Sequence, residues 1–220
     1  MLAWGSVMIV RPCGEQAIIV DVTEVDAEFP LRTVSQLRRL VESWDVDGIV
    51  DLVPASTTLL IMLDTARVTP MDVAKRLNSC DLRDAPADTD DNATLVEVPV
   101  LYDGPDLTSL AAALDWSPEE LVRRHCSTHW QAAFGGFAPG FTYLVAEDPL
   151  PPIPRLGSPR PSIPAGSVGL AGEFSGVYPQ SSPGGWQLIG STTAQMWAPE
   201  RSERPALIKP GDRVRFKAVY

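Results

Sequence analysis

Residues 134–144 read FGGFAPGFTYL, and the pattern continues with PRLGSPRPSIPAGSVGLAG at 154–172 and GVYPQSSPGGWQLIG at 176–190. The whole stretch from residue 134 to residue 190 holds most of the chain's 16 glycines and almost half of its 21 prolines, a density typical of disordered segments. Large rings and branched apolar residues lie between them, however, and a disordered segment lacks such groups because it has no core to bury. We therefore expect short ordered strands joined by stiff turns, which can hold a binding site in place.

The first part of the chain mixes expected strands and helices. Strands are expected at 7–11, 17–21, 48–53 and 57–63, and helices at 29–44 and 71–80. The strands are rich in β-branched residues and leucine, and the helices carry apolar residues at the spacing of one helix face. Thr69 is placed as the N-cap of the second helix, with Pro70 at its first position. Such a mixture predicts a small α+β domain, which we place at 1–83.

An acidic segment follows, with several aspartates and little apolar content. It predicts a solvated linker at 84–93 and a second domain at 94–220. That domain begins with an expected strand at 94–102, a helix capped by Asp106, and another helix capped by Ser117. Only short strands between turns come after them, a pattern that predicts an all-β barrel.

The composition narrows the class of protein. A net charge of -10 disfavours nucleic acid and anionic membranes as partners, although an acidic surface is also an ordinary route to solubility. No run of about 18 apolar residues is present, and the N-terminus lacks the pattern of a signal peptide. The three cysteines are scattered without a CxxC pair, which is typical of a reducing compartment. We expect a cytoplasmic protein with no nucleic-acid or membrane partner.

Several common catalytic motifs are missing from the sequence. Neither GxxxxGK[ST] nor GxGxxG occurs, so no common phosphate-binding loop is expected, and Ser167 does not lie in a GxSxG elbow. His125 and His129 have a spacing that zinc sites use, but the segment HCSTH has no adjacent acid and there is no third histidine. We therefore expect no metal site. A general acid/base role for His125 and a structural role at a helix C-terminus both stay open.

The remaining candidates lie in the glycine- and proline-rich stretch. Arg155 and Arg160 are expected in a loop stiffened by proline, and Gly184 and Gly185 expose backbone N–H groups, so together they suit a carboxylate or phosphoryl group. The alternative is that the arginines pair with surface acids and the glycines only turn the chain. The rings are open to two interpretations as well, as the lining of a pocket or as core.

The same stretch resembles a known family. GFAPGFTYL at 136–144 resembles the GFxPGFPYL signature of a bacterial family that includes the B subunit of ATP-dependent 5-oxoprolinase, allophanate hydrolase subunit 1 and Kip-type inhibitors of a sporulation kinase. The resemblance continues in the motifs at 154–160, 164–169, 178–179 and 183–190, and more weakly in VPVLYDGPDL at 98–107 and RPCGEQAIIV at 11–20. It spans almost the whole chain. One departure is Thr142, where the family pattern has proline.

The resemblance implies a fold and an activity. The fold class is α+β, with a small N-terminal α/β sandwich followed by a cyclophilin-like β-barrel of the carboxyltransferase-subdomain type. The implied activity is that of one subunit of an ATP-dependent hydrolase complex, in which ATP phosphorylates 5-oxoproline and hydrolysis of the activated ring yields glutamate. ATP with Mg is the implied cofactor, and whether this nucleotide-binding role falls to this chain or to another subunit stays open. Allophanate or another amide is the alternative substrate.

The resemblance also implies site residues and a partner. Because the family pattern has a histidine at this place, His125 is expected to be catalytic together with Arg160. The expected substrate- or anion-binding residues are Phe137, Pro139, Gly140, Phe141, Arg155, Gly166, Ser167, Tyr178, Gly184, Gly185 and Trp186. The implied partner is a second subunit with a related barrel, forming a heteromeric complex. The alternatives are a binding protein that inhibits a sensor histidine kinase and, from the implied barrel alone, a prolyl isomerase.

Overall fold

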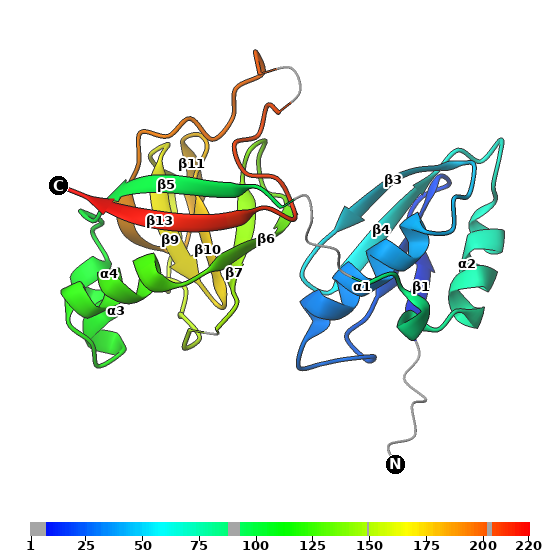
Figure 1. Ribbon diagram of the computed structural model, residues 1–220, viewed down its shortest axis with the longest axis horizontal. Coiled ribbons are helices and arrows are strands. Elements are labelled where there is room, and N and C mark those ends of the chain that lie inside the picture. The colour runs from blue at the N-terminus through cyan, green and yellow to red at the C-terminus, as the bar shows by residue number, and fades with distance from the viewer. Residues whose placement is uncertain (1–7, 88–92, 149, 202–203) are drawn as a thin grey trace. The chain divides into compact units, whose positions relative to one another are not determined.

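The computed structural model describes residues 8–87, 93–148, 150–201 and 204–220. Its internal contacts divide the chain into two compact units, Met1–Asp90 and Asp91–Tyr220 (Figure 1). The finer limits expected from sequence, with a linker at 84–93, stay predictions because residues 88–92 lie outside the described part. None of the helices in the described ranges is long and apolar enough to span a lipid bilayer.

The first unit is a sheet with helices on one face. Its elements are β1 (Ile9–Pro12), β2 (Ala17–Asp21), α1 (Pro30–Glu42), β3 (Ile49–Pro54), β4 (Thr58–Leu63), α2 (Pro70–Ser79) and the 3-10 helix η1 (Leu82–Asp84). The strands are antiparallel in the order β1-β2-β4-β3. Leu37 of α1 and Leu77 of α2 are fully buried in one core with Ile61 of β4. Thr69 caps α2 as predicted, because its hydroxyl accepts the N–H of Asp72.

The second unit is a β-barrel with two helices. Its elements are β5 (Leu95–Leu101), α3 (Leu107–Ala113), α4 (Pro118–Ser127), β6 (Trp130–Gly135), β7 (Thr142–Ala146), β8 (Arg160–Ile163), β9 (Ser167–Ala171), β10 (Phe174–Val177), β11 (Ser182–Gly184), β12 (Gln187–Ser191) and β13 (Arg213–Val219). The barrel closes in the order β10-β7-β6-β13-β5-β12-β9, and β11 pairs with β8 in a separate small sheet. The predicted fold class, a sandwich followed by a barrel, is confirmed.

Alternation along the strands builds the barrel core. Val96, Val98 and Val100 of β5 are buried and the residues between them are exposed, and Phe216 of the parallel strand β13 is buried beside them. Helices α3 and α4 pack against each other, α3 against β12 and α4 against β13. The seven strands close on themselves, with a long parallel pairing of β13 with β5 and short pairings of β12 with β5 and of β13 with β6.

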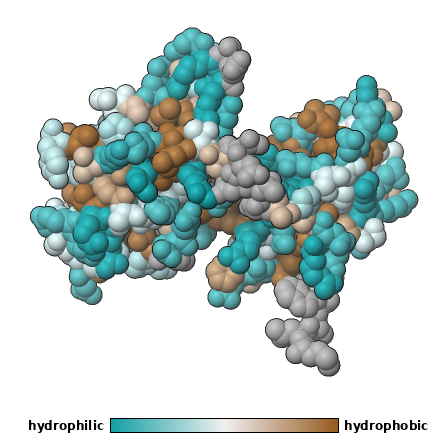
Figure 2. All heavy atoms as spheres, in the orientation of Figure 1, coloured by the Kyte–Doolittle hydropathy of each residue, from teal (hydrophilic) through white to brown (hydrophobic). Residues whose placement is uncertain are grey.

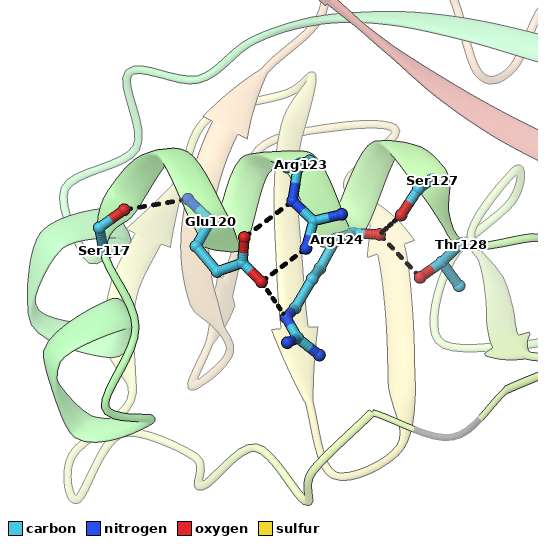
Figure 3. Close-up of polar contacts among 6 residues, drawn as sticks. All are labelled: Ser117, Glu120, Arg123, Arg124, Ser127 and Thr128. Carbon is cyan, nitrogen blue, oxygen red and sulfur yellow. Dashed lines mark hydrogen bonds and ion pairs between the residues drawn. The ribbon is translucent and has the colours of Figure 1, made fainter.

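Helix α4 is fixed at both ends, as Figure 3 shows. At its start the hydroxyl of Ser117 accepts the N–H of Glu120 at 3.2 Å, so the predicted cap is confirmed. Hydrogen bonds from Arg123 and Arg124 lower the pKa of Glu120 to about 2. At the other end, the hydroxyl of Thr128 donates to the carbonyl of Arg124 at 2.8 Å. The helix therefore holds a defined rotation, with its buried face toward the barrel core.

The surface of both units is mostly polar. Figure 2 shows hydrophilic residues over most of the visible face, with hydrophobic residues in scattered patches on each unit. The exposed large apolar residues of the barrel unit include three aromatic ones, Phe137, Trp197 and Tyr220, the last residue of the sequence. Single exposed apolar residues are ordinary, but exposed rings beside a cluster of buried ones draw attention to that place.

Candidate functional site

A cluster of aromatic side chains, here called the ring cluster, lies outside the barrel wall. It consists of Phe134, Phe137, Phe141, Tyr143, Phe174, Tyr178 and Trp186, whose neighbouring rings have centroids 4.5 to 6.4 Å apart. Leu144 belongs to the barrel core and Tyr143, the residue before it on β7, belongs to the ring cluster. Because successive side chains of a strand point to opposite faces, the cluster packs on the outer face of the barrel.

Two glycines make a flat seat for this cluster. Gly169 of β9 and Gly176 of β10 are paired directly across the two strands. A Cβ atom on Gly176 would lie 3.0 Å from Cζ of Phe141, and one on Gly169 would lie 3.2 Å from Cβ of Trp186. Both contacts are tighter than most Cβ atoms make, so the bare backbone lets the rings approach the wall without a shift of either ring.

The turn before β7 presents Phe137 to solvent. The N–H of Ala138 donates to the carbonyl of Gly136 at 2.7 Å, which closes a three-residue turn around Phe137 at a φ of 66°. This is the rare, strained form of the γ-turn, and a bulky residue seldom adopts it. The ring remains 57% exposed although its centroid lies 5.3 Å from that of Phe141. Strained backbone of this kind points to a function for the residue that it displays.

A second exposed ring, that of Trp197, packs on the next residues of the turn. Pro139 is exposed, and Gly140 has a φ of 83° that favours glycine. A Cβ on Gly140 would lie 2.8 Å from Cβ of Trp197, so the turn packs closely on the segment that carries this tryptophan. Trp197 is 37% exposed. Sequence reasoning did not select it, because it stands outside the glycine- and proline-rich stretch.

Arg155 is the exposed cation of the candidate site. Within the described residues it makes no hydrogen bond or ion pair, yet its charge acts on the hydroxyls of Tyr143 and Tyr178. Burial raises the pKa of both phenols, and the charge of Arg155 opposes that rise. An exposed guanidinium whose positive charge reaches two phenols can bind a planar anion. Tyr143 is thus a candidate that sequence reasoning treated only as a ring.

Arg160 lies in a strand, whereas the sequence predicted that it would lie in a loop stiffened by proline. It is the first residue of β8, opposite Gly184 of β11, and its Nη2 donates to Oδ1 of Asp106 at 2.7 Å. Asp106 stands at the N-cap position of helix α3 as predicted, but its carboxylate makes no capping hydrogen bond. Its Oδ2 accepts the N–H of Leu188 instead, at 2.7 Å. Asp106 and Arg160 therefore tie α3, β8 and β12 together.

The predicted glycine and serine residues hold Tyr178 in place. The N–H of Gly166 donates to the carbonyl of Tyr178 at 2.7 Å, and the N–H of Tyr178 donates to the carbonyl of Ser167 at 2.9 Å. A Cβ on Gly184 would lie 2.6 Å from the Tyr178 hydroxyl, so this position must stay bare. The carbonyl of Gly185 accepts the N–H of Leu156 at 2.8 Å, next to Arg155 in the chain. All four residues thus shape the surroundings of Arg155 and Tyr178.

His125 lies apart from these residues, inside the barrel. Its side chain is fully buried and stacks on Phe216 with ring centroids 4.3 Å apart. Nε2 lies 2.9 Å from the hydroxyl of Ser175, and Nδ1 lies 2.7 Å from the hydroxyl of Tyr102, which is also 3.2 Å from Sγ of Cys126. We call Tyr102, His125, Cys126 and Ser175 the His125 network.

The contacts of this network engage both ring nitrogens of His125. In either tautomer one nitrogen donates a hydrogen bond and the other accepts one, and the hydroxyls of Tyr102 and Ser175 can each take the complementary role. Burial lowers the pKa of His125 to about 3, so the ring is neutral near pH 7. A neutral ring with both nitrogens engaged and no exposed surface favours the structural interpretation of His125 over the acid/base one.

Two surface pockets lie away from the ring cluster. One has a volume of about 300 Å³ and lies between α1 and β3, with Arg38 and Asp51 in its lining. The other, of about 290 Å³, is lined by Leu95, Glu147 and Arg215 among others, together with His129, whose Nε2 lies 3.1 Å from Nη2 of Arg215. The ring cluster instead offers a displayed surface on which Arg155, the exposed rings and the stiff turns meet.

The chain is similar in sequence to a described protein family and to named proteins from other organisms. The model of the family described as carboxyltransferase domain, subdomain C and D, matches residues 8–208. The protein named as the B subunit of 5-oxoprolinase in Bacillus subtilis (strain 168) is 36% identical, over 96% of this chain and 92% of its own length. Its namesake from Escherichia coli O157:H7 is also 36% identical, over 92% of each chain.

Solved structures share the fold. TTHA0988, whose crystal structure is solved, has 32% sequence identity to this chain. Its structure matches with a TM-score of 0.73 over 96% of this chain and 40% of that one. This chain thus spans less than half of that protein. The Kluyveromyces lactis urea amidolyase has a TM-score of 0.75 at 20% identity, over 99% of this chain and 15% of that chain, a likeness that shows the fold alone.

Proposed function

Because the chain belongs to the carboxyltransferase-domain family, subdomain C and D, we propose that it is one subunit of an ATP-dependent complex that hydrolyses an amide or lactam bond. The two relatives that are named as 5-oxoprolinase subunits support 5-oxoproline as the substrate and glutamate as the product. The observation that carries the proposal is Arg155, an exposed guanidinium whose positive charge reaches the phenols of Tyr143 and Tyr178 in the ring cluster.

These groups suit an anion that forms during amide cleavage. The substrate has a carboxylate, and activation by ATP places a second anionic group, a phosphoryl group, on the lactam oxygen. A guanidinium can bind either group with two parallel hydrogen bonds, and phenol hydroxyls can donate to the same oxygens. The buried rings of Phe141 and Trp186 exclude water behind them, which strengthens each of these interactions.

The residues of this chain fit an anion better than they fit a complete site for ATP with Mg. The described part of the chain holds no group of three or more His, Cys, Asp or Glu side chains that could bind a metal ion. When bound to the complex, ATP supplies the phosphoryl group that activates the substrate oxygen. The role proposed for this chain is to bind and orient the anionic group, with the nucleotide held wholly or partly by other subunits.

The displayed rings suit a partner subunit. Phe137 within the stiff turn at 136–141 and Trp197, which packs on Gly140 of that turn, are both exposed, and aromatic residues of this kind form the centre of many interfaces. We propose that a second subunit packs here and completes the site. An obligate interface of this type buries roughly 2,000 Å² or more in total.

The same exposed rings also favour a second candidate function, inhibition of a sensor histidine kinase. An inhibitor needs a displayed binding surface rather than an enclosed pocket, and the ring cluster offers such a surface. The two functions differ in what they need, since an inhibitor would bind its kinase without any ATP-dependent turnover.

The test is ATP-dependent release of glutamate from 5-oxoproline. The chain is purified alone, its companion subunits are purified without it, and the two are mixed or co-expressed. Turnover only in the assembled complex supports the proposal. Full turnover by this chain alone contradicts the shared site, and an assembled complex without lactam or amide hydrolysis contradicts the enzyme proposal. Inhibition of kinase autophosphorylation by the chain alone would favour the second candidate.

A further inference from the structure

Arg160 has an acidic partner that is itself immobile. The carboxylate of Asp106 uses one oxygen for Nη2 of Arg160 and the other for the N–H of Leu188, each at 2.7 Å. The side chain of Asp106 is 9% exposed and that of Arg160 is 29% exposed. Both oxygens are therefore committed, and the ion pair is largely shielded from solvent.

The segment that carries Asp106 is locked onto β12. The N–H of Asp106 donates to the carbonyl of Leu188 at 3.0 Å, so the two residues bond in both directions. Just before it, the N–H of Gly104 donates to the carbonyl of Ile189 at 3.3 Å. A Cβ on Gly104 would lie 2.3 Å from the carbonyl carbon of Ile189, so backbone meets backbone there. Asp106 thus has a fixed position relative to the barrel.

Asp106 orients Arg160 but uses only one of the nitrogen atoms of its guanidinium. The structure describes one ion pair for the guanidinium, through Nη2, and its Nη1 is buried with no hydrogen-bond partner among the described residues. Its neighbour across the small sheet is Gly184, whose missing side chain leaves room at the Tyr178 hydroxyl. A guanidinium fixed at one nitrogen keeps a defined plane, and its other donors keep a defined direction.

We propose that Asp106 is a positioning residue for the anion site, and that it acts only through Arg160. It holds the guanidinium opposite Gly184, next to the place of the Tyr178 hydroxyl, so that the exposed edge of the guanidinium can face the anionic group. The proposal rests on the proposed function, because Arg160 needs an anion to act on. Without the carboxylate, the guanidinium would keep its charge and lose its direction.

The test compares two Asp→Asn changes in the assembled complex. Asp106→Asn keeps the shape and removes the charge. Asp212→Asn is the matched control, because Asp212 is also buried, pairs with Arg204 and accepts a backbone N–H, that of Lys209 at 2.6 Å. We expect similar losses of Tm in both variants. Only Asp106→Asn should lower kcat, by about 100-fold for a misplacement of about 1 Å. Asp106→Glu, which keeps the charge, should fold and lose about 10-fold.

A second measurement does not depend on activity. In the full chain with isotope-labelled arginine, the Nη protons of Arg160 should give separate, slowly exchanging NMR signals. Asp106→Asn should collapse them, and Asp212→Asn should leave them unchanged. Unchanged Arg160 signals in Asp106→Asn, or equal kcat in the two Asn variants, would overturn the positioning role. A wild-type complex with no ATP-dependent hydrolysis would overturn the proposed function instead, while the NMR result still decides whether Asp106 orients Arg160.

Discussion

The ring cluster and the His125 network use opposite faces of the same strand. Along β10, Phe174 and Gly176 face the ring cluster, while Ser175 and Val177 face the barrel core. On the inner face each polar atom of His125 has a partner and the ring is neutral. On the outer face a charged arginine has no ion pair among the described residues, and two rings are exposed.

This difference separates residues that stabilise the barrel from residues that can bind something. Buried polar groups with all their hydrogen bonds made cannot accept a ligand without losing stability. Exposed donors that bond only to water give up no contact within the protein when a ligand or partner arrives. The contrast therefore shifts the candidate site from His125 to the surroundings of Arg155, and each prediction below can break or sharpen it.

The largest effect is expected for Arg155→Ala in the assembled complex. Removal of one donor to a developing oxyanion should lower kcat/KM by about 100-fold to 1,000-fold, or about 3 kcal/mol. The Tm should hardly change, because the side chain is exposed. Arg123→Ala is the control, an exposed arginine on α4 that pairs with Glu120. Equal activity in the two variants would remove Arg155 from the site.

The next effect is a loss of stability in acid that depends on His125. Its pKa is about 3 in the folded chain and about 6.5 when unfolded, so below pH 6.5 the unfolded chain binds an additional proton. The contribution of the neutral His125 to the free energy of unfolding is fully present above pH 6.5. It decreases as the pH drops and is smaller by about 2 kcal/mol at pH 5. Urea unfolding at pH 7 and pH 5 measures it. His125→Gln should lose this pH-dependent part, and an identical pH dependence in both proteins would show that His125 does not contribute.

A smaller effect is expected for Tyr102→Phe. The change leaves Nδ1 of His125 buried without its hydrogen-bond partner and should lower the free energy of unfolding by about 1.5 kcal/mol. Activity in the complex should persist, because the network does not reach the outer face. Tyr220→Phe is the control, since that hydroxyl is fully exposed. A large fall in kcat with unchanged stability would return the His125 network to the catalytic candidates.

The smallest effect on stability has the opposite sign. Phe137→Gly should raise the free energy of unfolding by about 1 kcal/mol, because glycine accepts a φ of 66° without strain. Phe137→Ala is the control at the same position, since alanine keeps the strain. Both variants should bind the partner subunit more weakly in size-exclusion chromatography. Unchanged assembly would show that the strained ring serves another purpose.

Local patterns in the sequence determined the elements and the gathering of most site residues. The caps at Thr69 and Ser117 were predictable because a side-chain oxygen bonds an N–H only two or three residues away. The ordered nature of the stretch at 134–190 was predictable because its rings demand burial, and the structure does bring Phe141, Tyr178 and Trp186 together. These inferences need only near neighbours and composition.

Tertiary structure alone decided which polar groups are free. Asp106 and Arg160 are 54 residues apart, and His125 and Ser175 are 50 apart, so no local pattern could show that each pair meets. Burial then determines whether each of these polar side chains stays free to bind another molecule. It neutralises His125 inside the barrel and commits Asp106 to Arg160, while Arg155, five residues before Arg160, stays exposed. Which face of a strand a side chain occupies, and what the fold packs against that face, decides whether it stabilises the barrel or can bind a partner.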